Sequence, residues 1–96
     1  MSLLPDVEVR FHFDSNKKIR ENYRPAHEIK ENYLTTGVHH YYTSCGDELI
    51  GTITFLSPEY YPNCLWVGKK IKMFEGRKEI GYVEVLKIIN KILEKK

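Results

Sequence analysis

Two β-rich runs near the end of the chain constrain its fold more than any other feature. They cover residues 65–74 and 80–89, and the five residues between them include Gly76. A short connection that contains glycine is typical of a turn between paired antiparallel strands. The sequence therefore predicts a closing β-hairpin from Trp66 to Ile89.

The earlier part of the chain predicts further strands. Residues 7–14 alternate apolar and polar side chains without a break, so Val7, Val9, Phe11 and Phe13 share one face of a half-buried strand. A second strand should begin near Pro25, because proline cannot donate to a strand ladder. Weaker patterning over residues 27–42 fits two short strands around a bend, with a turn at residues 44–47, and residues 50–56 alternate again.

About six short strands with no strong helical pattern between them indicate an all-β closed barrel or a sandwich. Closure would also remove exposed strand edges. A chain of 96 residues is expected to form a single domain. We expect residues 1–5 to be disordered or a cloning remnant. Residues 90–96 form a tail, which either frays or ends in a short helix, since the apolar residues of 88–93 recur at helical spacing.

Charge sets a weaker constraint on the partner. The net charge is +2, which gives no field strong enough to indicate nucleic acid. The net charge is −2 over residues 1–50 and +4 over residues 51–96. The favoured interpretation is that the basic residues of the second half lie on the solvated face of a strand pair, and the alternative is a mild basic binding face. The basic residues concerned are Lys69, Lys70, Lys72, Arg77, Lys78 and Lys87.

Two cysteines, Cys45 and Cys64, lie in no metal-binding spacing and are expected to be reduced. The sequence contains no long apolar run and no basic-then-apolar leader, so we expect a cytoplasmic protein without a membrane partner.

Two short motifs complete the pattern. Tyr23-Arg24-Pro25 precedes a predicted strand, and Phe74-Glu75-Gly76 leads into the run Ile80-Gly81-Tyr82-Val83. Their order over residues 7–89 resembles the C-terminal (third) domain of elongation factor Tu, a translation-factor β-barrel. The resemblance implies a closed six-stranded antiparallel barrel. It differs at Tyr82 and Glu84, where the family has small or apolar residues.

The resemblance also bears on function. In that family, an arginine six residues after the arginine of Arg-Pro helps to hold the acceptor arm of transfer RNA, and Lys30 stands at this position. Lysine keeps the positive charge but not the bidentate phosphate contact of arginine. The GTPase that accompanies the barrel in the family is not encoded here, because no G-x-x-x-x-G-K-[ST] motif occurs. We therefore expect no bound nucleotide.

Metal binding and catalysis are the less favoured hypotheses. His39 and His40 could ligate zinc together with cysteine, but neighbouring strand residues point to opposite faces, so at most one of them can join a given site. Cys45 near either histidine is the only candidate nucleophile. We expect no enzyme activity, no metal and no cofactor.

Tyrosine is abundant, with seven residues in the chain. Two pairs occur, Tyr41-Tyr42 and Tyr60-Tyr61, and the loop at residues 57–63, which Pro58 and Pro62 bracket, is expected to expose the second pair. Exposed tyrosine beside lysine or arginine suits a protein interface or stacking on unpaired bases, whereas core packing is the simpler alternative.

The sequence therefore favours a non-catalytic binding module with a protein or RNA partner. The alternative is a structural or regulatory protein that forms a homo-oligomer through an uncovered strand, and a small enzyme ranks third. The candidate binding residues are Arg24, Lys30, Tyr60, Tyr61, Lys69, Lys70 and Lys72.

Overall fold

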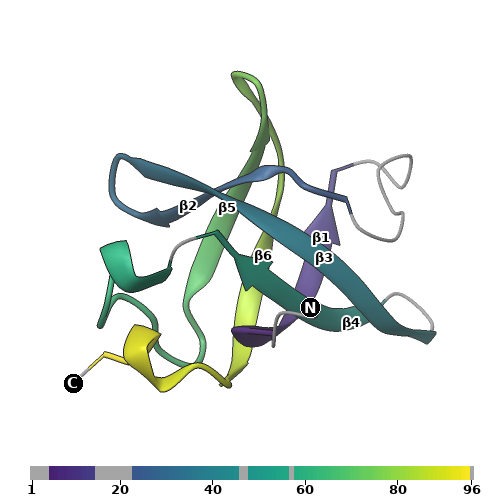
Figure 1. Ribbon diagram of the computed structural model, residues 1–96. Coiled ribbons are helices and arrows are strands. Elements are labelled where there is room, and N and C mark those ends of the chain that lie inside the picture. The colour runs from purple at the N-terminus through teal and green to yellow at the C-terminus, as the bar shows by residue number, and fades with distance from the viewer. Residues whose placement is uncertain (1–4, 15–22, 46–47, 57, 96) are drawn as a thin grey trace.

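Six antiparallel strands make up the fold in the computed structural model of the chain, which describes residues 5–14, 23–45, 48–56 and 58–95. Two single turns of 3-10 helix accompany them (Figure 1). The elements are β1 (Val7–Phe13), β2 (Ala26–Lys30), β3 (Tyr33–Cys45), β4 (Glu48–Phe55), η2 (Pro58–Tyr60), β5 (Lys70–Glu75), β6 (Lys78–Ile88) and η3 (Lys91–Leu93).

The strands close into a barrel in the order β1-β4-β3-β2-β5-β6, so β1 lies between β4 and β6. This confirms the all-β, six-stranded antiparallel barrel and excludes the sandwich alternative. The predicted inner face of β1 is also confirmed, because Val7, Val9 and Phe11 are buried. Phe13 is half-buried and packs against the core.

Several predicted boundaries differ from the observed ones. β5 begins only at Lys70, and the residues before it make a single bridge, between Leu65 and Glu94. Residues 27–42 do contain two strands around a turn, β2 and β3, but β3 is 13 residues long instead of short. The expected turn at residues 44–47 lies partly outside the described residues. The tail forms η3, which buries Leu93.

The closing hairpin turns tightly between β5 and β6. Glu75 pairs with Lys78, so Gly76 and Arg77 form the turn, and Gly76 has a φ of 64°. Glycine adopts this left-handed conformation without a steric penalty. The predicted hairpin is therefore confirmed. Its first strand begins later than expected, at Lys70.

Two strand glycines mark places where backbones approach closely. A Cβ atom on Gly81 would lie 2.0 Å from the carbonyl oxygen of His12, and one on Gly51 would lie 2.0 Å from that of His40. Gly81 also has a φ of 145°. Glycine at such positions allows a strand to bend sharply as a small barrel closes.

One end of the barrel carries most of the connecting structure. Since all neighbours are antiparallel, β1, β3 and β5 begin at this end and β2, β4 and β6 end there. We call it the capped end, because residues 58–69 and 89–95 lie across it. These two segments also pair with each other, since the backbone N–H of Leu65 donates to Leu93 O at 2.8 Å and that of Asn63 donates to Ile92 O at 2.8 Å.

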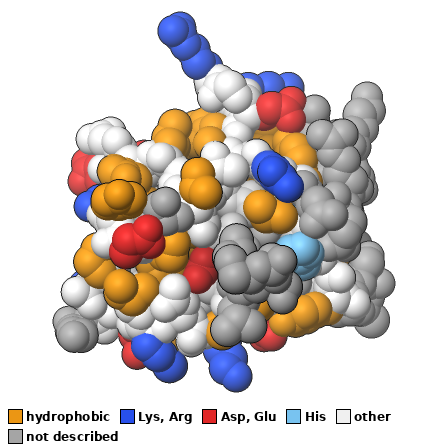
Figure 2. Space-filling model, viewed as in Figure 1, with side chains coloured by type: hydrophobic (Ala, Val, Ile, Leu, Met, Phe, Trp, Pro, Cys, Tyr) orange, Lys and Arg blue, Asp and Glu red, His pale blue; other side chains and the backbone are white. Residues whose placement is uncertain are grey.

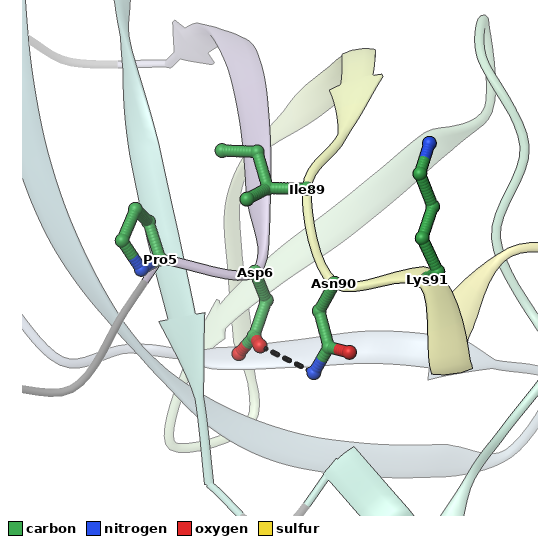
Figure 3. Close-up of a pocket in the computed structure, with 5 residues that line it drawn as sticks. All are labelled: Pro5, Asp6, Ile89, Asn90 and Lys91. Atoms are coloured by element: carbon green, nitrogen blue, oxygen red, sulfur yellow. Dashed lines mark hydrogen bonds between the residues drawn. The ribbon is translucent and has the colours of Figure 1, made fainter.

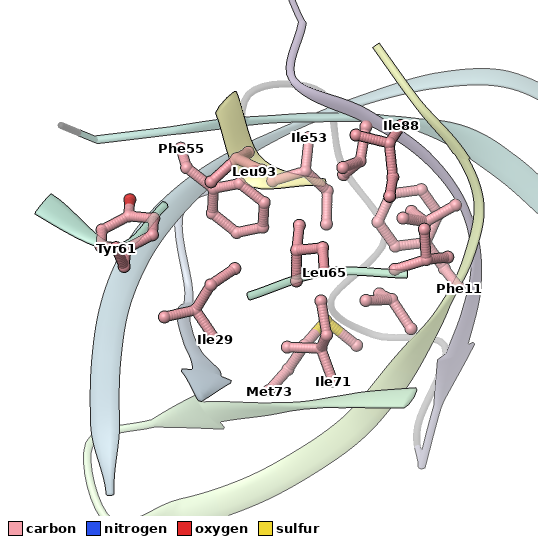
Figure 4. Packing of buried hydrophobic residues seen from close by; sticks show 14 of the residues in the cluster. Phe11, Ile29, Ile53, Phe55, Tyr61, Leu65, Ile71, Met73, Ile88 and Leu93 are labelled. Carbon is pink, nitrogen blue, oxygen red and sulfur yellow. The ribbon is translucent and has the colours of Figure 1, made fainter. Parts of the chain in front are cut away.

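The core fills the barrel and continues under the cap (Figure 4). Ile29, Ile53 and Ile71 from three different strands are completely buried. Leu65 and Leu93, which come from the two cap segments, are completely buried as well. At roughly 2 to 3 kcal/mol for each fully buried aliphatic side chain, the cap contributes materially to the stability of a domain this small.

Candidate binding surface at the capped end

Hydrophobic side chains gather on the surface of the capped end. Among the residues that the structure describes, every exposed large hydrophobic side chain except Tyr42 lies there. Figure 2 shows such side chains on the left of the molecule, where η2 lies in Figure 1. The group consists of Tyr33, Leu34, Leu56, Tyr60, Trp66, Val67, Ile89 and Ile92. We call it the cap surface.

Part of the cap surface is held together by β3 and β4. The backbone N–H of Leu56 donates to Thr36 O at 3.0 Å, and the hydroxyl of Thr35 donates to Leu56 O at 3.3 Å. These bonds place Leu56 beside the start of β3, which carries Leu34. Leu56 is 65% exposed and Leu34 is 52% exposed, so both present aliphatic carbon to solvent.

Tyr60 and Tyr61 have opposite roles. The prediction that the loop exposes both is confirmed for Tyr60, which is 72% exposed, and wrong for Tyr61, which is 1% exposed. The Tyr61 hydroxyl donates to Leu56 O and lies 3.0 Å from the hydroxyl of Thr35, and its ring packs against Phe55. Burial raises the pKa of Tyr61 to about 12. Tyr61 therefore fastens η2 to the barrel and leaves Tyr60 pointing outward.

A second part of the cap surface surrounds Trp66. The ammonium nitrogen of Lys69 lies 4.7 Å from the centre of the Trp66 ring, and that of Lys95 lies 5.0 Å from it. Both distances are within the range of cation–π attraction. In the part of the chain that the structure describes, neither ammonium group forms an ion pair.

Lys69 is half-buried and also has a structural role. β2 and β5 pair only at two positions, Ala26 with Phe74 and His27 with Met73, and then diverge toward the capped end. The ammonium group of Lys69 donates to Ile29 O at 2.6 Å and to Cys64 O at 2.8 Å, so it bridges the gap. Burial lowers the pKa of Lys69.

Replacing Lys69 with methionine is expected to destabilise the fold by about 1 to 3 kcal/mol, because two partly buried carbonyls lose their donor. Lys72→Met, on an exposed lysine of β5, provides the matched control and should change stability by less than about 0.5 kcal/mol. Urea denaturation followed by circular dichroism measures both. Equal midpoints for the two variants would show that the bridge contributes nothing.

The other predicted binding residues are spread over the molecule. Lys30 ends β2 at the capped end, with its ammonium group 5.2 Å from the centre of the Tyr33 ring. Lys70 and Lys72 are exposed on β5, and the ammonium group of Lys70 lies 5.5 Å from the centre of the Tyr82 ring. Arg24 precedes β2 and therefore lies at the opposite end. The structure thus brings Lys30, Tyr60 and Lys69 to the capped end together, with Lys70 at the adjoining start of β5 and Tyr61 buried.

Trp66, Leu34, Leu56, Ile92 and Lys95 were missed by the sequence analysis. Trp66 was placed inside a predicted strand, where an aromatic residue is expected to pack inward. The missing signal is Gly68, with a φ of 95°, which interrupts the β-rich run before Lys70. A break there indicates that the residues before it form a loop, whose aromatic side chain can be exposed.

The two adjacent histidines of β3 lie in different environments. His39 is completely buried and His40 is exposed, which confirms that they point to opposite faces of β3. The side chain of Cys45, the candidate nucleophile, lies outside the described residues. Within the described residues, no group of three or more histidine, cysteine or acidic side chains is arranged to hold a metal ion.

His39 instead meets His27 inside the barrel. Their Nε2 atoms lie 2.9 Å apart, and Nδ1 of His39 lies 3.0 Å from the Tyr41 hydroxyl. Burial lowers the pKa of His27 to about 4. The pKa of His39 falls to about 2, from burial and then from the nearby His27 and His40. Both rings are therefore neutral at neutral pH, and one of the two Nε2 atoms must donate to the other.

The hydrogen-bond chain allows two tautomer assignments, which depend on whether the Tyr41 hydroxyl donates to Nδ1 of His39 or accepts from it. If the Tyr41 hydroxyl donates to Nδ1 of His39, then Nε2 of His39 carries the proton and donates to Nε2 of His27. The proton of His27 then resides on Nδ1, which makes no hydrogen bond of normal geometry within the described residues. The carbonyls of Thr35 and Pro25 are close enough to raise the pKa of His27 slightly against the effect of burial. The two histidines are thus a buried, hydrogen-bonded polar pair inside the barrel.

A shallow cavity of about 330 Å³ also lies at the capped end, lined by Pro5, Asp6, Ile89, Asn90 and Lys91 (Figure 3). The Asp6 carboxylate accepts a bond of 2.6 Å from the backbone N–H of Phe55 and one of 2.9 Å from the Asn90 side chain. Burial raises the pKa of Asp6, and these two bonds oppose that effect. Both carboxylate oxygens are thus engaged in joining β1 to β4 and to the segment after β6.

None of the helical turns in the described residues is long and apolar enough to cross a membrane. Comparison of the chain with protein-family models, with curated proteins and with solved structures finds no match.

Proposed function

We propose that this chain is a barrel of the type found at the C-terminus of translation elongation factors, and that it acts as a non-catalytic binding module for a protein partner. The order of strands and the short motifs support the classification. The observation that carries the binding role is the cap surface, where nearly all exposed large hydrophobic side chains of the described residues gather. Large exposed apolar patches are typical of interaction sites.

The composition of the cap surface favours a protein over RNA. Trp66 and Tyr60 are residue types enriched at protein interfaces, and the aliphatic side chains of Leu34 and Leu56 offer little to a phosphate backbone. Acidic side chains such as Glu59 and Glu94 are exposed among them. RNA binding without base pairing uses a continuous basic groove, whereas Arg24 and the capped-end lysines lie at opposite ends of this barrel.

The closed barrel weakens the homo-oligomer alternative. Each of the six described strands has a neighbour on both sides, so unpaired backbone is limited to short stretches, such as those where β2 and β5 diverge. Self-association would have to use a surface of side chains, and the cap surface is the most apolar candidate.

The test is capture from the native cell extract with the full chain, followed by affinity measurement on the purified, identified partner. Replacing Leu56 and Tyr60 together with serine is expected to weaken binding at least about tenfold, since central apolar interface residues cost more than about 1 kcal/mol each. Tyr42→Ser, on the one exposed large hydrophobic side chain elsewhere in the described residues, should bind like the unaltered protein. Equal weakening by both variants, or retention of RNA alone, would refute the proposal.

A further inference from the structure

Trp66 and its two lysines form an unusual arrangement on the cap surface. Two ammonium groups, those of Lys69 and Lys95, share one aromatic ring. Like charges at this separation repel, and Lys95 accordingly contributes to the lowered pKa of Lys69. An anion between or above the two groups would relieve that repulsion.

The Lys69 ammonium group has a free donor. It carries three N–H groups, of which two are used by the carbonyls of Ile29 and Cys64. Within the described residues nothing accepts the third. The nearby Glu28 acts on Lys69 only from beyond ion-pair distance, and its carboxylate accepts from the backbone N–H of Asn32 at 3.3 Å. The third N–H is thus available to a ligand.

The Lys69 head group is also held in place before any ligand arrives, because its two carbonyl bonds fix it. For Lys95 it is the backbone that is held, since its N–H donates to Leu65 O at 2.7 Å. Lys30 adds a further positive charge close by, because both Lys30 and Lys69 oppose the burial that raises the pKa of the Cys64 thiol. Groups that are already ordered lose less entropy when they bind.

We infer that the protein partner of the cap surface presents an acidic segment, whose carboxylates contact Lys69 and Lys95 while a neighbouring apolar side chain packs on Trp66. This inference rests on the proposed function and specifies the chemistry of its partner. Charge complementarity supports it, because the cations around Trp66 have no ion-pair partner among the described residues. Carboxylates suit this site better than a nucleic-acid backbone, since its neighbours are aliphatic side chains and not a continued basic track.

The test uses a short peptide in which glutamates flank a leucine, and a counterpart with glutamine in place of glutamate. Trp66 is the only tryptophan, so its fluorescence reports on this position. We expect the glutamate peptide to change Trp66 emission and to bind the full chain, with an affinity that falls as salt rises above about 50 mM. The glutamine peptide should bind much more weakly.

A fluorescein label on the peptide allows variants to be compared by anisotropy. Lys95→Gln, on an exposed side chain, should weaken binding by about threefold to fivefold, and the charge reversal Lys95→Glu should weaken it further. Lys72→Gln, which removes a charge away from the cap surface, should leave binding unchanged. Thermal unfolding of each variant shows whether the fold is retained.

Three results would overturn the inference: equal binding of the two peptides, equal effects of Lys95→Gln and Lys72→Gln, or binding of an oligouridine RNA with no binding of the glutamate peptide. If the natural partner depends on Leu56 and Tyr60 but not on Lys95, the acidic segment is refuted while the proposed function stands. If the glutamate peptide binds through Lys95 while no partner depends on Leu56 and Tyr60, the proposed function fails instead.

Discussion

Acidification below about pH 6.5 is expected to destabilise the folded barrel with a slope that rises to about 3 kcal/mol per pH unit from its buried histidine pair. His27 and His39 have pKa values lowered to about 4 and about 2 in the folded protein, against 6.5 for an ordinary histidine. Well below pH 6.5, and above the pKa of about 4 of folded His27, the unfolded chain therefore binds about two protons that the folded chain does not, and each contributes about 1.4 kcal/mol per unit. Above that pH the pair has no such effect.

The magnitude is large for a domain of this size, whose total stability is expected to be about 5 to 14 kcal/mol. The raised pKa of Asp6 acts in the opposite direction, because the folded carboxyl takes up its proton before the unfolded one does. A single carboxyl binds at most one extra proton in the folded state, so it cannot cancel the effect of two histidines.

Urea denaturation at a series of pH values measures this dependence. His27→Gln keeps a polar partner for His39 and removes one titrating group, so the slope should fall by about half, to about 1.4 kcal/mol per unit. His40→Gln, on the exposed neighbour, is the control and should retain the full slope. The same slope for the unaltered protein and for His27→Gln would contradict the assignment.

Gly81→Ala is expected to destabilise the barrel by about 4 kcal/mol or more, and to leave it largely unfolded at elevated temperature. The added Cβ would lie 2.0 Å from His12 O, a backbone atom that cannot move without separating β1 from β6. The backbone angle adds a second cost, since a φ of 145° is strained for any L side chain.

Gly68→Ala distinguishes the cost of the steric overlap from the cost of the backbone angle. Gly68 also has a positive φ, of 95°, but a Cβ there would meet nothing within 4 Å. Its replacement should therefore cost only the conformational part, about 1 to 2 kcal/mol. Thermal and urea unfolding of both variants give the comparison, and a Gly81 variant no less stable than the Gly68 variant would show that the barrel can relax around the overlap.

The sequence alone predicts the strands best where one face is buried and the pattern has period two. β1, with its alternating Val7 to Phe13, and the hairpin around Gly76 were predicted because local residue types decide them. β3 was predicted poorly, because Gly37 and the two adjacent histidines obscure its alternation. Gly37 is required by packing, since a Cβ there would lie 2.6 Å from an Ile53 side-chain atom, and this contact is invisible in the sequence.

The cap surface was predicted only in part. Tyr60 was found from its proline-bounded loop, but nothing local distinguishes it from Tyr61, because the choice depends on which ring reaches Thr35 and Phe55. Lys69 was proposed as a surface cation, whereas its bonds to Ile29 and Cys64 arise from the divergence of β2 and β5. Lys95 lies beside Trp66 because the two cap segments pair with each other. These segments are far apart in the sequence, so local sequence patterns do not reveal the contact.

The position of β1 between β4 and β6 also constrains the order in which the strands can pair during folding. β1 is the first strand to be synthesised, yet one of its edges can be satisfied only when Ile88, at the end of β6, has been made. Until then the partner of β1 on that side does not exist. The β3–β4 and β5–β6 hairpins can form locally before β1 pairs with β6 and closes the barrel. We therefore expect slow folding governed by this long-range closure, with the nascent chain exposing an open strand until β6 has been synthesised.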